Sequence, residues 1–171
     1  MKLLSISCWL LAVSAALCGC GSSYSWRSAV PVDARTVAVP TFRNESNVSE
    51  IGSLASRQLL REFQREGTFK VRTSGEAAIE VQGVIKSVSP ALSAYNRRSN
   101  GRVAAYALSA TAEISFIDKR TRKVLVDNRK YVANATFTAG QDQTTAVRDA
   151  SGRLMDDLAR QVVNDILNLK W

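Results

Sequence analysis

The spacing of apolar residues changes twice along this chain, and these changes constrain its fold more than any single motif does. Between Ile51 and Phe63 apolar side chains recur every three or four residues, as they do on the buried face of a helix. From Ala78 to about Phe137 the period is close to two, which is typical of half-buried strands. The helical spacing then returns over residues 146–169. The chain therefore places several strands between two amphipathic helices.

Turn signals divide the segments of period two into separate strands. Asn100-Gly101 is a strong signal for a tight hairpin, and Asp118–Lys123 reads as a charged turn. A short β-branched run that stops at Pro40 precedes the first helix and predicts one more strand. The four predicted strands are Arg35–Pro40, Ala78–Leu92, Tyr106–Phe116 and Val124–Phe137, and the irregular alternation of the fourth suggests a bulge.

Capping residues predict where the two helices begin and end. Asn47, with Glu50 three residues later, resembles a capping box at the start of the first helix, and Gly67 is suited to end it. Asp142 can cap the second helix. The prediction is an α+β fold in the order βαβββα, with two helices packed on one face of a four-stranded mixed sheet.

The chain directions in this arrangement sort the loops into two groups. One end of the sheet receives Pro40–Ser49, Ser93–Arg102 and Thr138–Gln141. The other end receives Gly67–Glu76, Asp118–Lys123, the C-terminus and the segment that leads in from the N-terminus. The two hairpin tips are therefore expected at opposite ends of a long sheet, where one compact ligand cannot touch both.

The N-terminal segment reads as a bacterial lipoprotein signal. Lys2 is followed by an apolar run that ends in Leu17-Cys18-Gly19-Cys20, with Leu three residues before the last Cys and a small Gly directly before it. Cleavage there leaves Cys20 to carry the acyl chains, which hold a protein on a membrane permanently. Gly21, rather than Asp, favours the outer membrane. The predicted division is a signal over 1–19, a lipidated tether over 20–34 and one domain over 35–171.

Two other readings of the N-terminus are an ordinary cleaved signal with incidental cysteines and an uncleaved anchor. The order and spacing of the residues fit the lipoprotein signal better than either of them. With Cys20 acylated and the two earlier cysteines removed, the mature domain has no disulfide and depends on its apolar core.

The composition argues against an enzyme. The chain has no histidine, which removes the usual general base and most catalytic zinc sites. It contains no phosphate-binding glycine motif, no cluster of metal ligands and no feature that calls for a cofactor. A hydrolase that uses Ser, Lys or paired carboxylates has no support in the sequence. The net charge of +8 also suits nucleic acid, but an exported lipoprotein rarely meets it.

The candidate binding residues are basic and lie on the two hairpin tips. One tip has an aromatic residue and no acid, so an anion-binding role and a solvated turn are about equally well supported there. For the other tip a solvated charged turn is favoured. The candidates are Tyr95, Arg97, Arg98 and Arg102 on the first tip and, more weakly, Lys119, Arg120, Arg122 and Lys123 on the second.

Several segments, in order, resemble the LptE family of lipopolysaccharide-assembly lipoproteins. They are Cys20-Gly21, Thr36–Ser46, Arg61–Phe63, Gly67–Val71, Glu80–Ile85 and Leu158–Val163. The chain departs from the usual pattern at Ser22-Ser23, where members often have Tyr directly after Cys-Gly. It also has Arg122 where many have Gly in a Thr-Gly-Lys-Val hairpin.

The resemblance implies a non-enzymatic lipoprotein of the outer membrane. Such a protein plugs the lumen of an LptD-type β-barrel, assists the assembly of that barrel and binds lipopolysaccharide on its way to the outer leaflet. Arg97, Arg98 and Arg102 would then contact lipid A phosphates or carboxylates in the lumen. A second resemblance, carried by Val37–Pro40 and Gly67–Phe69, is to periplasmic lipoproteins that activate peptidoglycan synthases or act in curli secretion.

Overall fold

The computed structural model describes residues 30–95, 103–138 and 143–171, and it has the predicted α+β architecture. The sheet has six strands in place of four, in the order β3-β1-β4-β5-β6, with β2 also paired to β4. The elements are η1 (Val32–Ala34), β1 (Thr36–Ala38), β2 (Arg43–Asn44), α2 (Ile51–Glu66), β3 (Lys70–Val71), β4 (Ile79–Tyr95), β5 (Val103–Asp118), β6 (Lys123–Thr138) and α3 (Gln143–Leu167). The two additional strands, β2 and β3, lie in segments predicted as loops, because two residues are too few to show a period.

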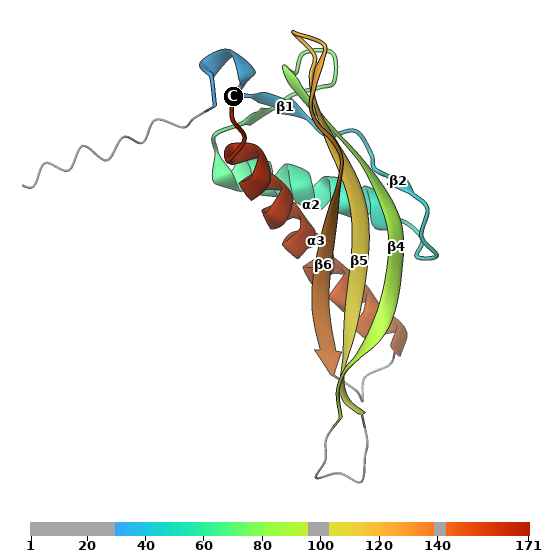
Figure 1. Cartoon of the computed structure of the whole chain (residues 1–171). Helices are drawn as coiled ribbons and strands as arrows, with labels where there is room; N and C mark the ends of the chain where they lie inside the picture. Colours follow the sequence, from blue (N-terminus) through green and yellow to red (C-terminus); the bar gives the residue numbers. More distant parts are fainter. Residues whose placement is uncertain (1–29, 96–102, 139–142) are drawn as a thin grey trace, which may run out of the picture.

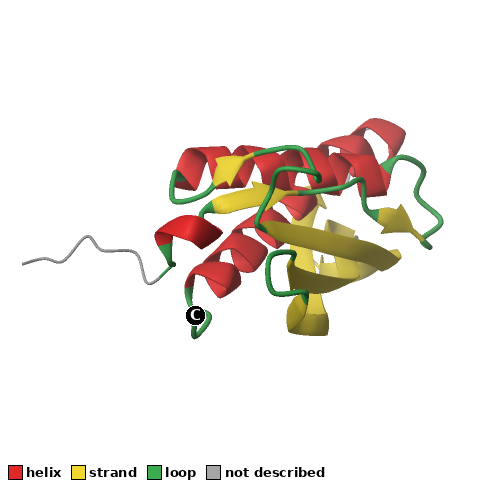
Figure 2. Ribbon diagram, turned by 90° about the horizontal axis from the view of Figure 1, so that it is seen from above, coloured by secondary structure: helices red, strands yellow, loops and turns green. Residues whose placement is uncertain are grey.

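Three long antiparallel strands form a curved sheet, and α2 and α3 cover one of its faces (Figure 1). Seen from above, the short parallel strands β1 and β3 lie against the helices at one end of this sheet (Figure 2). The alternation on β5 explains the layers, because every second side chain from Leu108 to Phe116 is buried against the helices. The intervening residues, such as Ser109 and Thr111, lie on the face that the helices leave open.

Of the two helices, α3 runs along the long strands, whereas α2 covers only one part of the sheet (Figure 1). β2 pairs with Val84 and Ile85, so the Pro40–Ser49 loop lies beside the middle of β4 and not at its far end as predicted. The reason is direction: α2 crosses the long strands and does not run along them, so the loop that leads into it lies beside β4 and not beyond the end of that strand (Figure 1). The far half of the β4–β5 hairpin therefore extends well beyond α2.

The start of α2 differs from the predicted capping box. Glu50 occupies the N-cap with φ 61°, and no side chain caps the helix there. The loop is instead fixed by Asn44, whose amide accepts the Ser46 N–H at 2.9 Å and donates to the Val48 carbonyl at 2.8 Å. The predicted end of the helix is confirmed, since Gly67 adopts φ 84°, which favours glycine.

The predicted irregularity in the last strand is also confirmed. The β5–β6 register shifts between Ile114 and Phe116, so that Asp127 and Asn128 both lie opposite Ser115. Asn128 has φ 42°, and its N–H donates to the Ser115 hydroxyl at 2.8 Å. This bulge bends β6 near the end of the sheet where the chain enters the domain.

The residues just before β1 belong to the folded core. Val30 and Ala34 are buried, although they fall within the predicted tether. The Arg35 guanidinium donates to the Val30 carbonyl at 3.1 Å. The part of this segment that the structure describes, Val30–Ala34, is therefore packed against the domain.

Candidate functional site

The β5–β6 turn, one of the two basic tips predicted from the sequence, is organised around a buried carboxylate. Asp118 is only 6% exposed. Its Oδ1 accepts the backbone N–H groups of Arg120, at 2.9 Å, and Thr121, at 3.3 Å. The Arg120 guanidinium donates to both carboxylate oxygens, at 3.3 and 2.9 Å. These charge-assisted bonds fix the shape of the turn.

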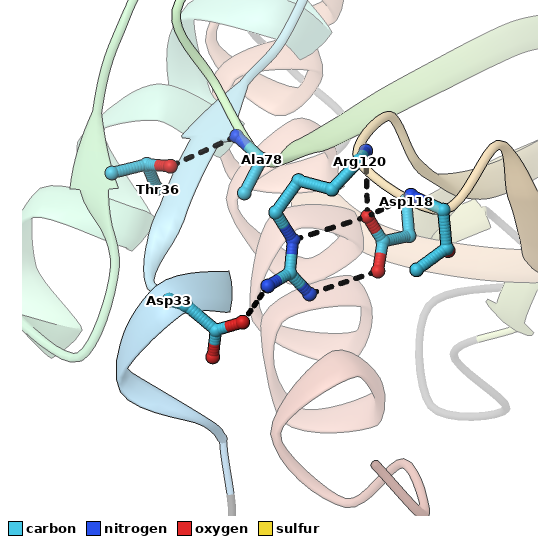
Figure 3. Close-up of polar contacts among 6 residues, drawn as sticks. Asp33, Thr36, Ala78, Asp118 and Arg120 are labelled. Atoms are coloured by element: carbon cyan, nitrogen blue, oxygen red, sulfur yellow. Dashed lines mark hydrogen bonds and ion pairs between the residues drawn. The ribbon is translucent and has the colours of Figure 1, made fainter.

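Arg120 also joins the turn to the N-terminal segment. Its third guanidinium nitrogen, Nη1, pairs with Asp33 in η1, as Figure 3 shows. In the same view, the Thr36 hydroxyl accepts the Ala78 N–H at 2.8 Å and so ties β1 to the start of β4. The chain entering from the N-terminus is thus held directly beside the β5–β6 turn.

Lys119 has a similar structural role. Its ammonium group donates to the Ser74 carbonyl at 2.6 Å and pairs with Glu80 at 3.0 Å. The pKa of the Glu80 carboxyl is below its usual value, first because Gln82 donates a hydrogen bond to it and then because Lys119 lies beside it.

The other two predicted cations of this turn face solvent. Arg122 and Lys123 are exposed, and among the described residues neither has a hydrogen-bond or ion-pair partner for its side chain. Arg122 also has φ 56°, a backbone conformation that favours glycine. Of the four weaker candidates, Lys119 and Arg120 therefore have structural partners, while Arg122 and Lys123 are free to bind a ligand.

The β4–β5 ladder, which leads to the other predicted basic tip, runs away from the β5–β6 turn. The β4–β5 ladder begins with Ile79 opposite Asp118 and ends with Tyr95 opposite Val103. Tyr95 is thus the last residue of β4, and Arg97, Arg98 and Arg102 lie outside the described residues. Along the strand, Tyr95 lies about 50 Å from the end of β4 that is beside the β5–β6 turn.

Polar clusters that sequence reasoning missed lie on the open face of the sheet and where α3 meets β6. On the open face, Lys86 pairs with Glu45 at 2.7 Å and with Glu113 at 3.7 Å. The pKa of Glu45 is lowered, chiefly by its hydrogen bond with Lys86. These pairs had no signal in the sequence, because the residues come from three different segments.

The contact between α3 and β6 includes a tyrosine and a carboxylate. Asp165 accepts from the Tyr131 hydroxyl and pairs with Arg129 at 2.5 Å. Burial and the neighbouring Asp165 raise the pKa of Tyr131 above its ordinary value. Asp165 continues a polar row with Arg153, Asp157 and Gln161 at four-residue steps, and that spacing was visible in the sequence.

Two open cavities lie among the described residues. One, of about 410 Å³, is on the open face of the sheet between Arg43, Glu80 and Glu113. The other, of about 530 Å³, separates the N-terminal halves of α2 and α3 near Leu54 and Val147. Within the three described ranges no group of three potential metal ligands occurs. None of the helices in these ranges is long and apolar enough to cross a membrane.

This architecture is shared with bacterial lipoproteins of known structure. Lipoprotein B from Nitrosomonas europaea has a TM-score of 0.54 at 15% identity, over 85% of this chain and 90% of that one. A minor lipoprotein from Acinetobacter baumannii has a TM-score of 0.51 at 13% identity, over 78% and 93%. A protein from Xanthomonas campestris has a TM-score of 0.55 at 9% identity, over 85% and 88%. At such identities the similarity establishes the fold.

The fold thus defines the class, an α+β domain of the kind found in small bacterial lipoproteins. The chain belongs to the LptE family, whose model, described as lipopolysaccharide-assembly, matches residues 34–166. No curated protein matches the sequence. Membership assigns the chain to lipopolysaccharide assembly, as an outer-membrane-associated lipoprotein of a non-enzymatic family.

Proposed function

We propose that this protein plugs the lumen of an LptD-type β-barrel, assists the assembly of that barrel and helps to deliver lipopolysaccharide to the outer leaflet. The observation that carries the proposal is the family match over residues 34–166, which spans nearly the whole folded domain. The signal ending at Cys20 supports it, because an acylated cysteine keeps the domain on the membrane that holds the barrel.

The shape of the domain supports insertion into a lumen. The far half of the β4–β5 hairpin projects beyond α2, at the end of the molecule opposite the chain entry (Figure 1). This projecting part presents Tyr95 and, in the proposal, the three arginines at its tip. Arginine binds phosphate and carboxylate through paired N–H donors, so Arg97, Arg98 and Arg102 are proposed to contact lipid A phosphates or lumenal carboxylates.

Co-purification tests the plug directly. The tagged full-length lipoprotein is extracted from outer membranes in mild detergent, and the proteins retained with it are identified and quantified. We expect a large β-barrel of the lipopolysaccharide-transport type in a one-to-one ratio. A peptidoglycan synthase in its place would favour the alternative function, and an absence of any barrel would contradict the proposal.

A matched pair of variants tests the arginine tip. Replacing Arg97, Arg98 and Arg102 together with Ala is expected to weaken lipopolysaccharide binding by roughly tenfold or more, because up to three charge-assisted contacts are lost. The control replaces Arg57, Arg148 and Arg160 with Ala, which removes the same charge from exposed helix positions. If both triple variants bind lipopolysaccharide equally, net charge is responsible and the tip is not the site.

A further inference from the structure

The end of the molecule where the chain enters carries a group of unpaired cations. It is formed by η1, β3, the β3–β4 loop, the β5–β6 turn and the C-terminus, and Figure 2 looks down on it. Within the described ranges, five exposed cations of this end have no ion-pair partner, in contrast to Lys119 and Arg120. The five are Lys70, Arg72, Arg122, Lys123 and Lys170. We call this surface the entry face.

Half of the described acidic groups at this end are paired with cations. Asp33 and Asp118 pair with Arg120, and Glu80 pairs with Lys119. Glu66, Glu76 and the terminal carboxylate have no ion-pair partner among the described residues, so the unpaired cations outnumber the unpaired acids. The entry face is therefore positive overall.

Two apolar side chains accompany these cations. Val32 in η1 is 79% exposed, the highest value among the exposed large hydrophobic residues, and Val124 in β6 is 49% exposed. Val32 directly precedes Asp33, which pairs with Arg120. Val124 directly follows Lys123 at the β5–β6 turn. An exposed apolar residue among cations is typical of surfaces that bind the headgroup region of a membrane.

The covalent chain keeps this face close to the lipid anchor. Val30 is the tenth residue after Cys20, so the two lie no more than about 35 Å apart along the chain. Tyr95, at the far end of β4, lies about 50 Å along the strand from this face. Of the two basic ends, the entry face is thus the one that remains within reach of the headgroups around the anchor. At physiological salt, screening limits the attraction between exposed charges to about 8 Å. The cations must therefore lie close to the headgroups to bind them.

We propose that the entry face binds the anionic phospholipid headgroups of the leaflet that holds the lipid anchor, with Arg122 and Lys123 as the principal contacts and Val32 inserted among the headgroups. This inference rests on the lipid anchor in the proposed function. The contact orients the domain: it holds the entry face on the bilayer and leaves the far hairpin to engage the barrel.

The test uses the purified full-length lipoprotein in vesicles of phosphatidylcholine, with and without about one-third phosphatidylglycerol. Flotation of the vesicles first establishes that the chain is anchored. Hydrogen–deuterium exchange is then followed in peptides that cover the β3–β4 loop and the β5–β6 turn. We expect exchange there to slow by roughly threefold or more with phosphatidylglycerol at about 0.05 M salt, and to recover at about 0.5 M.

Charge reversal identifies the residues. Arg122→Glu with Lys123→Glu is expected to abolish the protection, whereas Arg57→Glu with Arg148→Glu makes the same charge change on the helices and leaves it intact. Equal exchange in both kinds of vesicle, or protection that survives Arg122→Glu with Lys123→Glu, would overturn the proposal. Protection that appears only when the barrel is added would assign the face to protein contact. The first two outcomes are read in vesicles that contain no barrel, so they do not depend on the plug.

Discussion

At the scale of single residues, Phe42 shows how closely the segment after β1 is fitted to the rest of the domain. Its N–H donates to the Ser56 hydroxyl at 2.8 Å, and its side chain is buried. A Cβ on Gly83 would lie 2.4 Å from the Phe42 ring, and a Cβ on Gly52 would lie 2.3 Å from its carbonyl oxygen. Gly52 on α2 and Gly83 on β4 are therefore the sites where the position of Phe42 leaves no room for a side chain.

Replacement of Gly52 by Ala is the corresponding prediction. The added methyl group must displace the Phe42 backbone, which is not a flexible neighbour, so we expect a loss of about 1–3 kcal/mol in the free energy of unfolding. The control is Gly152→Ala, in α3, where an added Cβ meets nothing within 4 Å and the gain in helix propensity is up to about 1 kcal/mol. Urea denaturation of both variants measures the difference, and equal effects would refute the close approach at Gly52.

At the scale of elements, the row of polar side chains on α3 closes the free edge of β6. Arg153 donates to the Thr136 carbonyl at 3.0 Å, and Gln161 donates to the Val132 carbonyl at 3.2 Å. Asp157 accepts the Asn134 N–H at 3.3 Å. Three outward backbone groups of β6, on alternate residues, thus have partners on one helix. Edge strands that lack such cover pair readily with other chains.

We therefore predict that the row keeps the protein from associating through β6. Arg153→Ala, Asp157→Ala and Gln161→Ala together expose the edge and should shift the chain from monomers to dimers and larger assemblies. Light scattering at increasing concentration measures this shift. The matched control on the same helix, Arg148→Ala, Asp149→Ala and Asn164→Ala, also removes one Arg, one Asp and one amide. Association of the control to the same extent would mean that surface charge, and not the edge, determines solubility.

The elements also show what the sequence can and cannot reveal. Periodicity predicts the long strands and both helices, because each repeats its pattern over many residues. The short strands β2 and β3 depend on hydrogen bonds to residues distant in the chain, for example Arg72 N–H to the Val37 carbonyl at 2.9 Å, and have no pattern of their own. For the same reason, the partners of Lys119 and Arg120 could not be foreseen, whereas the cationic character of the turn could.

At the scale of the whole molecule, the two predicted basic tips are connected to opposite ends of an elongated sheet. The β4–β5 ladder links them, with Ile79 opposite Asp118 at the entry end and Tyr95 opposite Val103 at the far end. The entry end is fixed by ion pairs to η1, and the far end projects beyond α2. In our two proposals, one end therefore contacts the membrane and the other engages the barrel and its glycolipid.

This separation predicts that the two sets of substitutions act independently. Arg122→Glu with Lys123→Glu should leave lipopolysaccharide affinity unchanged, and the triple Ala variant of Arg97, Arg98 and Arg102 should leave vesicle-dependent protection of the β5–β6 turn unchanged. In the variant that combines both sets, lipopolysaccharide affinity should equal that of the triple Ala variant, and vesicle-dependent protection should equal that of the double Glu variant. We expect a coupling free energy of no more than about 0.5 kcal/mol, because the effects of substitutions at sites with no shared partner are additive. Affinity titrations and hydrogen exchange on the combined variant measure both. A coupling above about 1 kcal/mol would mean that the sheet transmits binding from one end to the other, since the ends are too far apart for direct contact.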